Sequence, residues 1–310
     1  MRVILMGGLG NQLFQYAFAL SLLDEYGRDV IIDPNFTAIR LDENGLPEIS
    51  KFQLDSRVIL AEKATYPAFF KRLVGFGIRT SLQQRKVSSR LVLLLVHPIL
   101  KVCLSVFFRD NVRIVFGRDN GFDKRCIDKK YSLYLGYFQS YRFSSATKVR
   151  ESLVSLKPKA DSATVSWFVD KAVNDRPLVV HVRLTDYRSE ANFGIPSKEY
   201  FEKAISNQLQ TGRYRKIWLF SDEPTEAIEF IPIKHRPLVE NVSAQSLGTV
   251  ETLEVMRLGR GYVIANSSFS WWGAHLSKNT DVRTIFPSPW FSGMPTPNHL
   301  CPPNWLPFAR

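Results

Sequence analysis

The sequence contains little cysteine. Three of its 310 residues are cysteines, Cys103, Cys126 and Cys301, and they lie far apart. None of them has the paired spacing of a zinc site, and three scattered cysteines do not make a disulfide framework. The first residues also lack the basic start, apolar core and small-residue cleavage site of a secretory signal peptide. These absences predict a protein of the reducing cytoplasm.

Several catalytic signatures are missing as well. The chain has no Asp-x-Asp pair, which could hold a diphosphate through a metal ion, and no Gly-x-Ser-x-Gly nucleophile motif. It also has no cluster of histidine and cysteine with metal-ligand spacing. We therefore expect no cofactor and no bound metal. If the ligand carries phosphate groups, cationic side chains and helix N-termini have to hold them.

Acidic residues are fewer than basic residues. The chain has 29 Asp and Glu against 41 Lys and Arg, which gives a net charge of +12. This excess predicts an anionic partner such as nucleic acid, anionic lipid or a sugar nucleotide, unless it only keeps the surface soluble. A basic nucleic-acid-binding protein is the non-enzymatic alternative, although no helix-turn-helix, RNA-binding or zinc signature is present. The apolar fraction of 45% indicates a globular chain, and its length suits one large or two medium domains.

A glycine-rich turn stands near the start of the chain. It follows an apolar run at 3–5 and precedes residues 11–26, which repeat apolar side chains at helical spacing up to Gly27. With a second apolar run at 30–32, this order predicts a βαβ unit and a parallel sheet. Leu13 stands where a dinucleotide fingerprint has its third glycine, and the Gly-Lys-Ser/Thr of a P-loop is absent. The turn is therefore either structural or a backbone site for an anion.

A basic and apolar insertion follows near residues 70–113. Between 71 and 113 there are nine basic residues and one acid, Asp110, and the segment contains the run LVLLLVHPILKVCLSVFF. That run raises the question of a transmembrane helix, which needs about 20 apolar residues. His97, Pro98 and Lys101 interrupt it, so we expect a helix pair. This pair either touches an anionic membrane or is buried with a solvated basic face. A membrane-anchored structural role is a further alternative.

The second half of the chain alternates strands and helices. We place a domain boundary in the polar segment near 157–163, so that residues 1–156 and 157–310 form two domains. Strands are expected at 177–184, 215–224, 261–268 and 283–290, the last of the chain, and helices at 162–173, 197–210, 250–259 and from 269. Two α/β halves predict two Rossmann-like domains that bind a ligand in a cleft at the carboxyl ends of their strands.

Polar residues follow three of the expected strands. The first group, His181, Arg183, Asp186 and Glu190, lies in HVRLTDYRSE. Arginine is a bidentate partner for phosphate oxygens, and the two carboxylates are candidates for a general base. Structural ion pairs are the alternative for this segment.

The other two groups are LFSDEP, with Asp222, and ANSSFSWW, with Ser267, Ser268 and Ser270. Hydroxyl groups beside a helix N-terminus are suited to hold phosphate. We expect the adjacent Trp271 and Trp272 to pack in the core.

Four segments in this order resemble glycosyltransferase family 11, the bacterial-type α-1,2-fucosyltransferases. They are GGLGNQLFQYAFA, HVRLTDY, LFSDEP and NSSFSWWGAHL, and they span residues 7–276. The resemblance implies a GT-B fold, in which two Rossmann-like domains face each other across a cleft. It implies GDP-fucose as donor, inversion at the sugar carbon and no required metal.

The resemblance also bears on the acceptor. It implies transfer to the 2-hydroxyl of a terminal β-galactose in a bacterial surface glycan of O-antigen or lipopolysaccharide type. A lipid-linked acceptor would suit the basic, apolar insertion and a peripheral position on the inner face of the cytoplasmic membrane. A GDP-sugar transferase of different linkage or acceptor is the alternative.

The resemblance implies roles for individual residues. The family usually has His-x-Arg-Arg-x-Asp in its central motif, and here Arg183 matches the first arginine while Leu184 replaces the second. In related enzymes the first arginine contacts the donor β-phosphate. The positions expected near the GDP are His181, Asp222, Ser267, Ser268, Phe269 and Ser270. The positions expected at the sugar end of the donor are Gly8, Gly10, Asn11 and Gln12. Leu184 removes one positive charge from this pattern.

Overall fold

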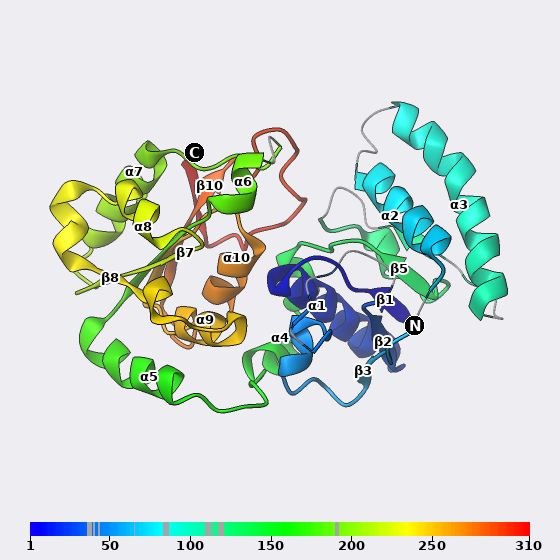
Figure 1. Cartoon of the computed structure of the whole chain (residues 1–310), viewed down its shortest axis with the longest axis horizontal. Helices are drawn as coiled ribbons and strands as arrows, with labels where there is room; N and C mark the ends of the chain where they lie inside the picture. Colours follow the sequence, from blue (N-terminus) through cyan, green and yellow to red (C-terminus); the bar gives the residue numbers. More distant parts are fainter. Residues whose placement is uncertain are drawn as a thin grey trace. The chain divides into compact units, whose positions relative to one another are not determined.

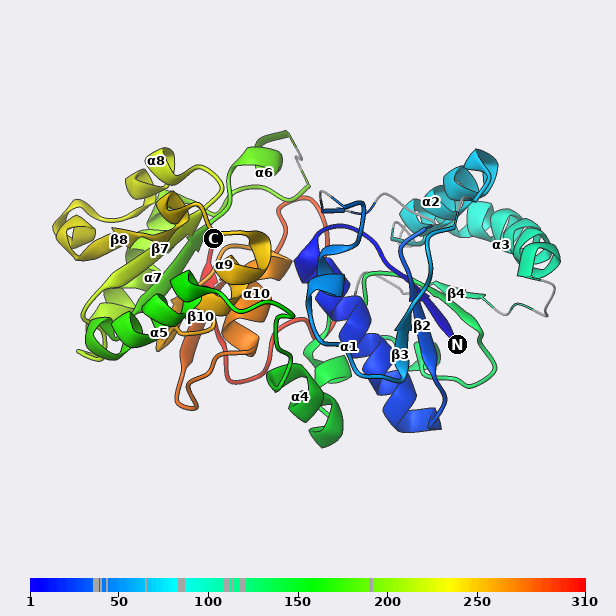
Figure 2. The ribbon, with the colours of Figure 1, turned by 60° about the horizontal axis from the view of Figure 1, so that its bottom comes forward.

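The protein forms two compact units, each built around its own parallel β-sheet (Figures 1 and 2). The computed structural model describes residues 1–310 except 36–38, 40, 43, 65, 83–86, 109–111, 113, 117–120 and 190–191. The first unit is Met1–Lys159 with Pro297–Cys301, and the second is Ala160–Thr296 with Pro302–Arg310. The predicted α/β fold with two Rossmann-like domains is confirmed. The cleft between them stays a prediction.

The first unit has a sheet with the strand order β3-β2-β1-β5-β4, and every pair in it is parallel. Its strands are β1 (Arg2–Ile4), β2 (Val30–Asp33), β3 (Val58–Leu60), β4 (Ile114–Phe116) and β5 (Leu133–Leu135), and its α-helices are α1 (Leu9–Tyr26), α2 (Ala68–Leu82), α3 (Val87–Phe108) and α4 (Thr147–Val154). The first strand in the sequence, β1, lies between β2 and β5. The strand order therefore reverses at the β1–β5 pair.

Alternating side chains place helices on both faces of this sheet (Figure 2). On one face Tyr134 of β5 meets Phe18 of α1, with ring centroids 5.3 Å apart. On the other face Leu133 of β5 packs with Leu100 and Leu104 of α3. The sequence predicted the position of α1 closely, including its end at Gly27, which has a left-handed φ of 60° and donates its N–H to Leu23 O.

The second unit has the strand order β11-β10-β9-β6-β7-β8, again with parallel pairs throughout. Its strands are β6 (Leu178–Val182), β7 (Ile217–Ser221), β8 (Val239–Asn241), β9 (Gly261–Val263), β10 (Arg283–Ser288) and β11 (Leu306–Ala309), and its α-helices are α5 (Ala163–Asp175), α6 (Thr185–Ser189), α7 (Lys198–Leu209), α8 (Pro224–Ala227), α9 (Thr249–Met256) and α10 (Ser268–His275). Numbered within the unit from β8, this order is 3-2-1-4-5-6, that of a Rossmann sheet. Its direction reverses between β6 and β9.

The predicted helices of the second unit are confirmed by their N-caps. The Ser162 hydroxyl accepts from the Val165 amide at the start of α5, and that of Ser197 accepts from the Tyr200 amide at the start of α7. Trp271 and Trp272 are fully buried, as predicted.

The expectation that 283–290 forms the last strand is wrong. β11 follows it and pairs with β10, with Leu306 opposite Ile285. The short run LPFA contains Pro307, which argued against a strand. At the outer edge of a sheet, however, a proline can point its missing N–H away from the ladder.

The insertion near 70–113 forms the predicted helix pair, α2 and α3, which lie side by side (Figure 1). Among the described residues, no helix is both long enough and apolar enough to cross a membrane.

The hydroxyl of Tyr200 joins α7 to the sheet, and its contribution to stability can be measured. This buried hydroxyl donates to Ile264 O at 2.8 Å and also lies 3.3 Å from Ile285 O, so it links α7 to β10 and to the residue that follows β9. Tyr200→Phe should lower the free energy of unfolding by about 1–2 kcal/mol, because buried carbonyl groups lose a donor without a change in shape. Urea denaturation measures this loss. An unfolding midpoint equal to that of the unmodified protein would contradict it.

Candidate active site

Three sequence motifs meet at the carboxyl edge of the second sheet. His181 belongs to β6, Arg183 follows this strand directly, and Asp222 directly follows β7. Asn266 and Ser267 follow β9 and lead into α10. Since β6 pairs with both β7 and β9, the parallel strands bring these side chains to one edge, at the point where the strand order reverses.

Arg183 is held through one of its three guanidinium nitrogens. Its Nε donates to Asp186 Oδ1 at 2.8 Å and lies 3.3 Å from Asp222 Oδ2. Within the described part of the chain, neither η nitrogen donates a hydrogen bond. Two carboxylates thus fix the direction of the side chain and leave the fork of the guanidinium to an anionic ligand.

Asp222 supports the loop that carries Arg183. Its Oδ1 accepts from the Leu184 amide at 2.9 Å and its Oδ2 from the Thr185 amide at 3.0 Å. Burial alone would raise the pKa of Asp222, but hydrogen bonds from Thr185 and Leu184 and the charge of Arg183 hold it below its ordinary value. The observed contacts of this predicted donor-binding residue are to the loop, and through the loop it sets the place of Arg183.

His181 is buried beside Arg183. It is 5% exposed, and its Nδ1 is buried without a hydrogen-bond partner among the described residues. Burial, aided by the charge of Arg183, lowers the pKa of His181 from 6.5 to about 3. The imidazole is therefore neutral at physiological pH, and its Nδ1 is available to a ligand.

The start of α10 forms the third wall of the site. The Ser267 hydroxyl accepts from the Phe269 amide, and the buried Ser270 hydroxyl donates to Ser267 O. These two hydroxyls shape the turn itself, whereas Ser268 and Phe269 are partly exposed. The N-terminal amides of α10 offer a favourable potential for an anion at this edge.

Asn266 was not singled out by its sequence pattern, although it belongs to the same motif. Its Nδ2 donates to Phe193 O at 3.0 Å and Gly194 O at 3.1 Å, and its main-chain oxygen accepts from the Tyr187 hydroxyl at 2.8 Å. Its Oδ1 is buried with no partner in the described chain. Asn266 therefore ties two loops of the site together and leaves one acceptor unused.

Of the two candidate bases, the structure describes one. Asp186 lies in α6, with its side chain about half exposed and one oxygen engaged by Arg183. Glu190 lies outside the described residues, so only Asp186 can be placed in the site.

A second group of polar residues stands at the corresponding edge of the first sheet. Gln139, which follows β5, donates from Nε2 to Oδ1 of Asn11 in α1 at 2.9 Å. Gln139 is 9% exposed, and its Oε1 is buried with no partner among the described residues. Because β1 and β5 are neighbours, this pair also lies where a strand order reverses. The sequence pattern did not single out Gln139.

The glycine turn itself shapes the place of Asn11. Gly7 has a φ of +68°, and a Cβ there would stand 2.5 Å from Asn11 Nδ2. Gly8 caps α1, and Gly10 is buried within it. Gln12 uses both ends of its buried amide on the main chain, donating to Gly7 O and accepting from Ile49 N. Of the two amides predicted to face the donor, Asn11 is partly exposed and Gln12 is not.

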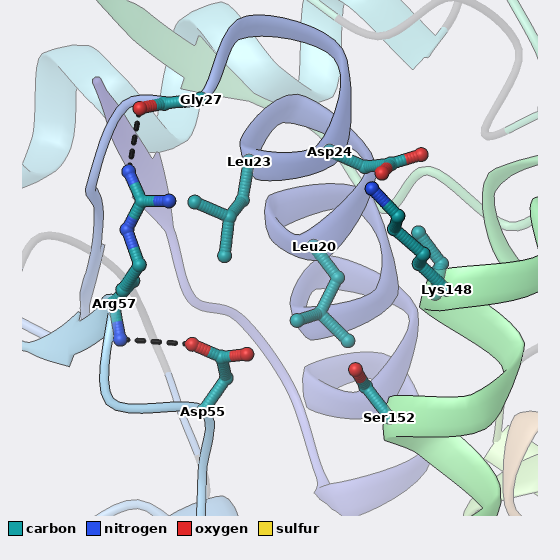
Figure 3. A pocket seen from close by; sticks show the side chains of 9 residues that line it. Leu20, Leu23, Asp24, Gly27, Asp55, Arg57, Lys148 and Ser152 are labelled. Atoms are coloured by element: carbon teal, nitrogen blue, oxygen red, sulfur yellow. Dashed lines mark hydrogen bonds between the residues drawn. The ribbon is translucent and has the colours of Figure 1, made fainter.

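A pocket of about 330 Å³ in the first unit lies away from these residues (Figure 3). It is lined by the C-terminal half of α1, by Asp55 and Arg57 before β3, and by Lys148 and Ser152 of α4. At 1.5 Å per residue, Gly27 lies about 24 Å along α1 from Asn11. This pocket is therefore at the opposite end of the helix from the switch point of the sheet.

The buried His181 predicts a pH dependence of stability. The unfolded chain takes up a proton below its pKa of 6.5, whereas the folded protein keeps His181 neutral down to about 3. The stability from this group is therefore complete above pH 6.5 and is lost as the pH falls toward 3. In His181→Gln the free energy of unfolding should fall less steeply with acid, by up to about 1.4 kcal/mol per pH unit. Denaturation curves at several pH values measure the slope, and an identical slope in both proteins would refute the buried neutral state.

Comparison with known proteins supplies the family. The model of glycosyl transferase family 11 matches residues 1–305. The chain is 25% identical to an α-1,2-colitosyltransferase of Escherichia coli over 97% of this chain and 96% of that protein. It is also 25% identical to the O-antigen biosynthesis glycosyltransferase WbnK of Escherichia coli, over 93% of this chain and 94% of that protein.

Solved structures show a weaker likeness. POFUT1 in complex with GDP-fucose aligns with 92% of this chain and 97% of its own, with 14% identity and a TM-score of 0.47. The match of the family model covers nearly the whole chain, including every motif that meets at the two sheet edges. The chain belongs to glycosyl transferase family 11.

Proposed function

We propose that this glycosyltransferase moves L-fucose from GDP-β-L-fucose to the 2-hydroxyl of a terminal β-galactose, with inversion and without a metal ion. The observation that carries the proposal is the guanidinium of Arg183. It stands at the switch point of a Rossmann sheet, is held by Asp186 and Asp222 through Nε, and donates no hydrogen bond from either η nitrogen within the described chain. A diphosphate is the ligand that such a fork and a nearby helix N-terminus accommodate.

The reaction is a single displacement. The acceptor oxygen bonds to C1 of fucose from the face opposite the leaving group, and the bond from C1 to the phosphate oxygen breaks and leaves its electron pair on GDP. Positive charge grows on the sugar ring and negative charge on the β-phosphate. Arg183 stabilises the latter, because a preorganised donor acts most strongly where charge develops.

The proton of the acceptor hydroxyl needs a place to go. Asp186 is the first choice for the base and Glu190 the second, since a carboxylate beside the donor can accept this proton. The neutral His181 offers Nδ1 to a ligand or a water molecule. No step is assigned to a metal, because the sequence has no Asp-x-Asp pair and Arg183 supplies a positive charge for the diphosphate.

A second donor deserves the same test. The relative that transfers colitose suggests GDP-colitose, whose sugar lacks the 3-hydroxyl of fucose. A site built to bond that hydroxyl would reject colitose strongly, whereas a site without such a contact would accept both sugars. Assays with both donors separate these cases. A different linkage or acceptor is the remaining alternative.

The acceptor belongs to the same proposal. The relative named for O-antigen biosynthesis supports a bacterial surface glycan. We place the terminal galactose on a lipid-linked precursor and the enzyme in the cytoplasm, at the inner face of the membrane. Incubation with GDP-fucose and a panel of β-galactosides, with the linkage read by NMR, tests donor, acceptor and linkage together. Nucleic-acid binding that falls steeply with salt, in the absence of transfer, would favour the non-enzymatic alternative.

Arg183→Ala should lower kcat about 10²- to 10³-fold while the protein stays folded, because the charge on the leaving β-phosphate loses its donor. Transfer to a soluble β-galactoside measures the loss. Arg213→Ala is the matched control, since Arg213 pairs with Asp281 and precedes β7, at the opposite edge of the sheet. A folded Arg183→Ala enzyme with near-normal kcat/KM would remove Arg183 from the mechanism.

Gln139 should act as a positioning residue for Asn11. In Gln139→Glu the side chain no longer donates to Asn11 Oδ1, so the Asn11 amide loses its fixed direction, and kcat should fall about tenfold or more with little change in Tm. Asn11→Asp keeps the acceptor for Gln139 but replaces the NH₂ group by a charged oxygen, and should lose more activity. Gln53→Glu, at an exposed site of the same unit, is the control. Unchanged kcat in Gln139→Glu beside an inactive Asn11→Asp would show that Asn11 works without this support.

A further inference from the structure

Helix α3 presents an apolar stripe to solvent. Leu95, Ile99, Val102 and Val106 are 70%, 53%, 63% and 75% exposed, and their spacing of four, three and four residues puts them on one side of the helix. The opposite side carries Leu100 and Leu104, which are fully buried against the first sheet. The stripe is therefore not the core face of α3, and it is too long to count as scattered exposed residues.

Cations accompany this stripe. Lys101 of α3 and Lys71 and Arg72 of α2 are exposed. Residues 68–108, which span both helices, contain no Asp or Glu. An apolar stripe accompanied only by positive charge is the composition of a helix that lies in the plane of a membrane interface. Such a helix buries its apolar side among the acyl chains and keeps its charges at the headgroups.

We propose that the α2–α3 face, defined by the apolar stripe of Leu95, Ile99, Val102 and Val106, binds the surface of an anionic phospholipid bilayer. Lys71, Arg72 and Lys101 of the same two helices supply the positive charge. The positive charge of the two helices distinguishes among a second copy of the chain, a protein partner and a lipid surface as the binding partner of this face. A second copy of the chain would set like charges against each other, and a protein partner would need a matching acidic rim. Anionic headgroups supply the opposite charge and the acyl chains supply the apolar contact.

The face has a consequence for the substrate. If the acceptor is lipid-linked, which rests on the proposed function, membrane binding brings enzyme and acceptor into the same thin layer and raises their encounter rate. The binding itself does not depend on the donor or acceptor. It can therefore be measured without either.

The test is co-sedimentation of the full chain with vesicles of phosphatidylethanolamine and phosphatidylglycerol, compared with vesicles of phosphatidylcholine. Binding to the anionic vesicles is expected. Leu95→Ser/Val102→Ser should weaken it about tenfold or more through lost apolar burial. Lys71→Gln/Lys101→Gln should weaken it about tenfold at low salt and much less at high salt. Ile233→Ser/Lys234→Gln, an exposed pair in the second unit, is the control and should bind normally.

Each other outcome overturns the assignment. Failure of the full chain to bind anionic vesicles, or normal binding by the Leu95→Ser/Val102→Ser variant, excludes this face as the membrane surface. A dimer of the unmodified protein that the same variant dissociates would identify a second copy as the occupant. Transfer to a soluble β-galactoside, measured on the same variants, should be unchanged. A failure of the proposed transfer reaction is thus distinguished from a failure of membrane binding.

Discussion

The contact of Asp222 with the loop after β6 is the constraint on which the candidate site depends. Both carboxylate oxygens are bonded to main-chain amides of that loop, and the same group lies 3.3 Å from Nε of Arg183. One partly exposed acid thus joins the ends of β6 and β7 and helps to orient a cation. Neutralising Asp222 would weaken the hold on the loop and remove one of the two carboxylates that orient the guanidinium, which would leave Asp186 as its other partner.

Both sheet edges combine satisfied and unsatisfied polar groups in the same way. Gln12 and Gln15 of α1 are fully buried and spend both ends of their amides on the main chain, which fixes α1 against the strand ends. Around them, Gln139 Oε1 in the first unit and Asn266 Oδ1 in the second are buried without a partner in the described chain. An unpaired buried acceptor costs about 1–3 kcal/mol. Such an acceptor occurs at both switch points, beside predicted site residues. This agrees with sheet edges whose polar groups bind a ligand at a cost in stability.

The basic, apolar insertion differs from the two sheet edges, because one side of its helix α3 is buried and the other is exposed. Its helices cover one face of the first sheet with Leu100 and Leu104, so half of α3 is ordinary core. The other half does not pack against the sheet. Its exposed Leu95 and Val106 would lower solubility unless something covers them. The same segment thus completes a fold and offers a surface, and the two uses occupy opposite sides of one helix.

The sequence by itself determined the local structure and the family. Apolar periodicity and the Gly27 stop located α1, the alternation of strands and helices located α5 and α7, and four ordered motifs pointed to family 11. It also supplied Arg183, whose chemistry and position after a strand are readable from HVRLTDY. Helix starts, helix stops and strand alternation depend on neighbouring residues, which is why they could be predicted.

Only the tertiary structure decided what depends on strands far apart in the sequence. β11 was missed because its pairing with β10 is invisible in a four-residue run that contains proline. Gln139 was missed because its partner Asn11 is 128 residues away and becomes a neighbour only when β5 pairs with β1. The residues of an α/β site are in general far apart in the sequence. The order of parallel strands in the sheet, and not their order in the chain, sets which loops meet.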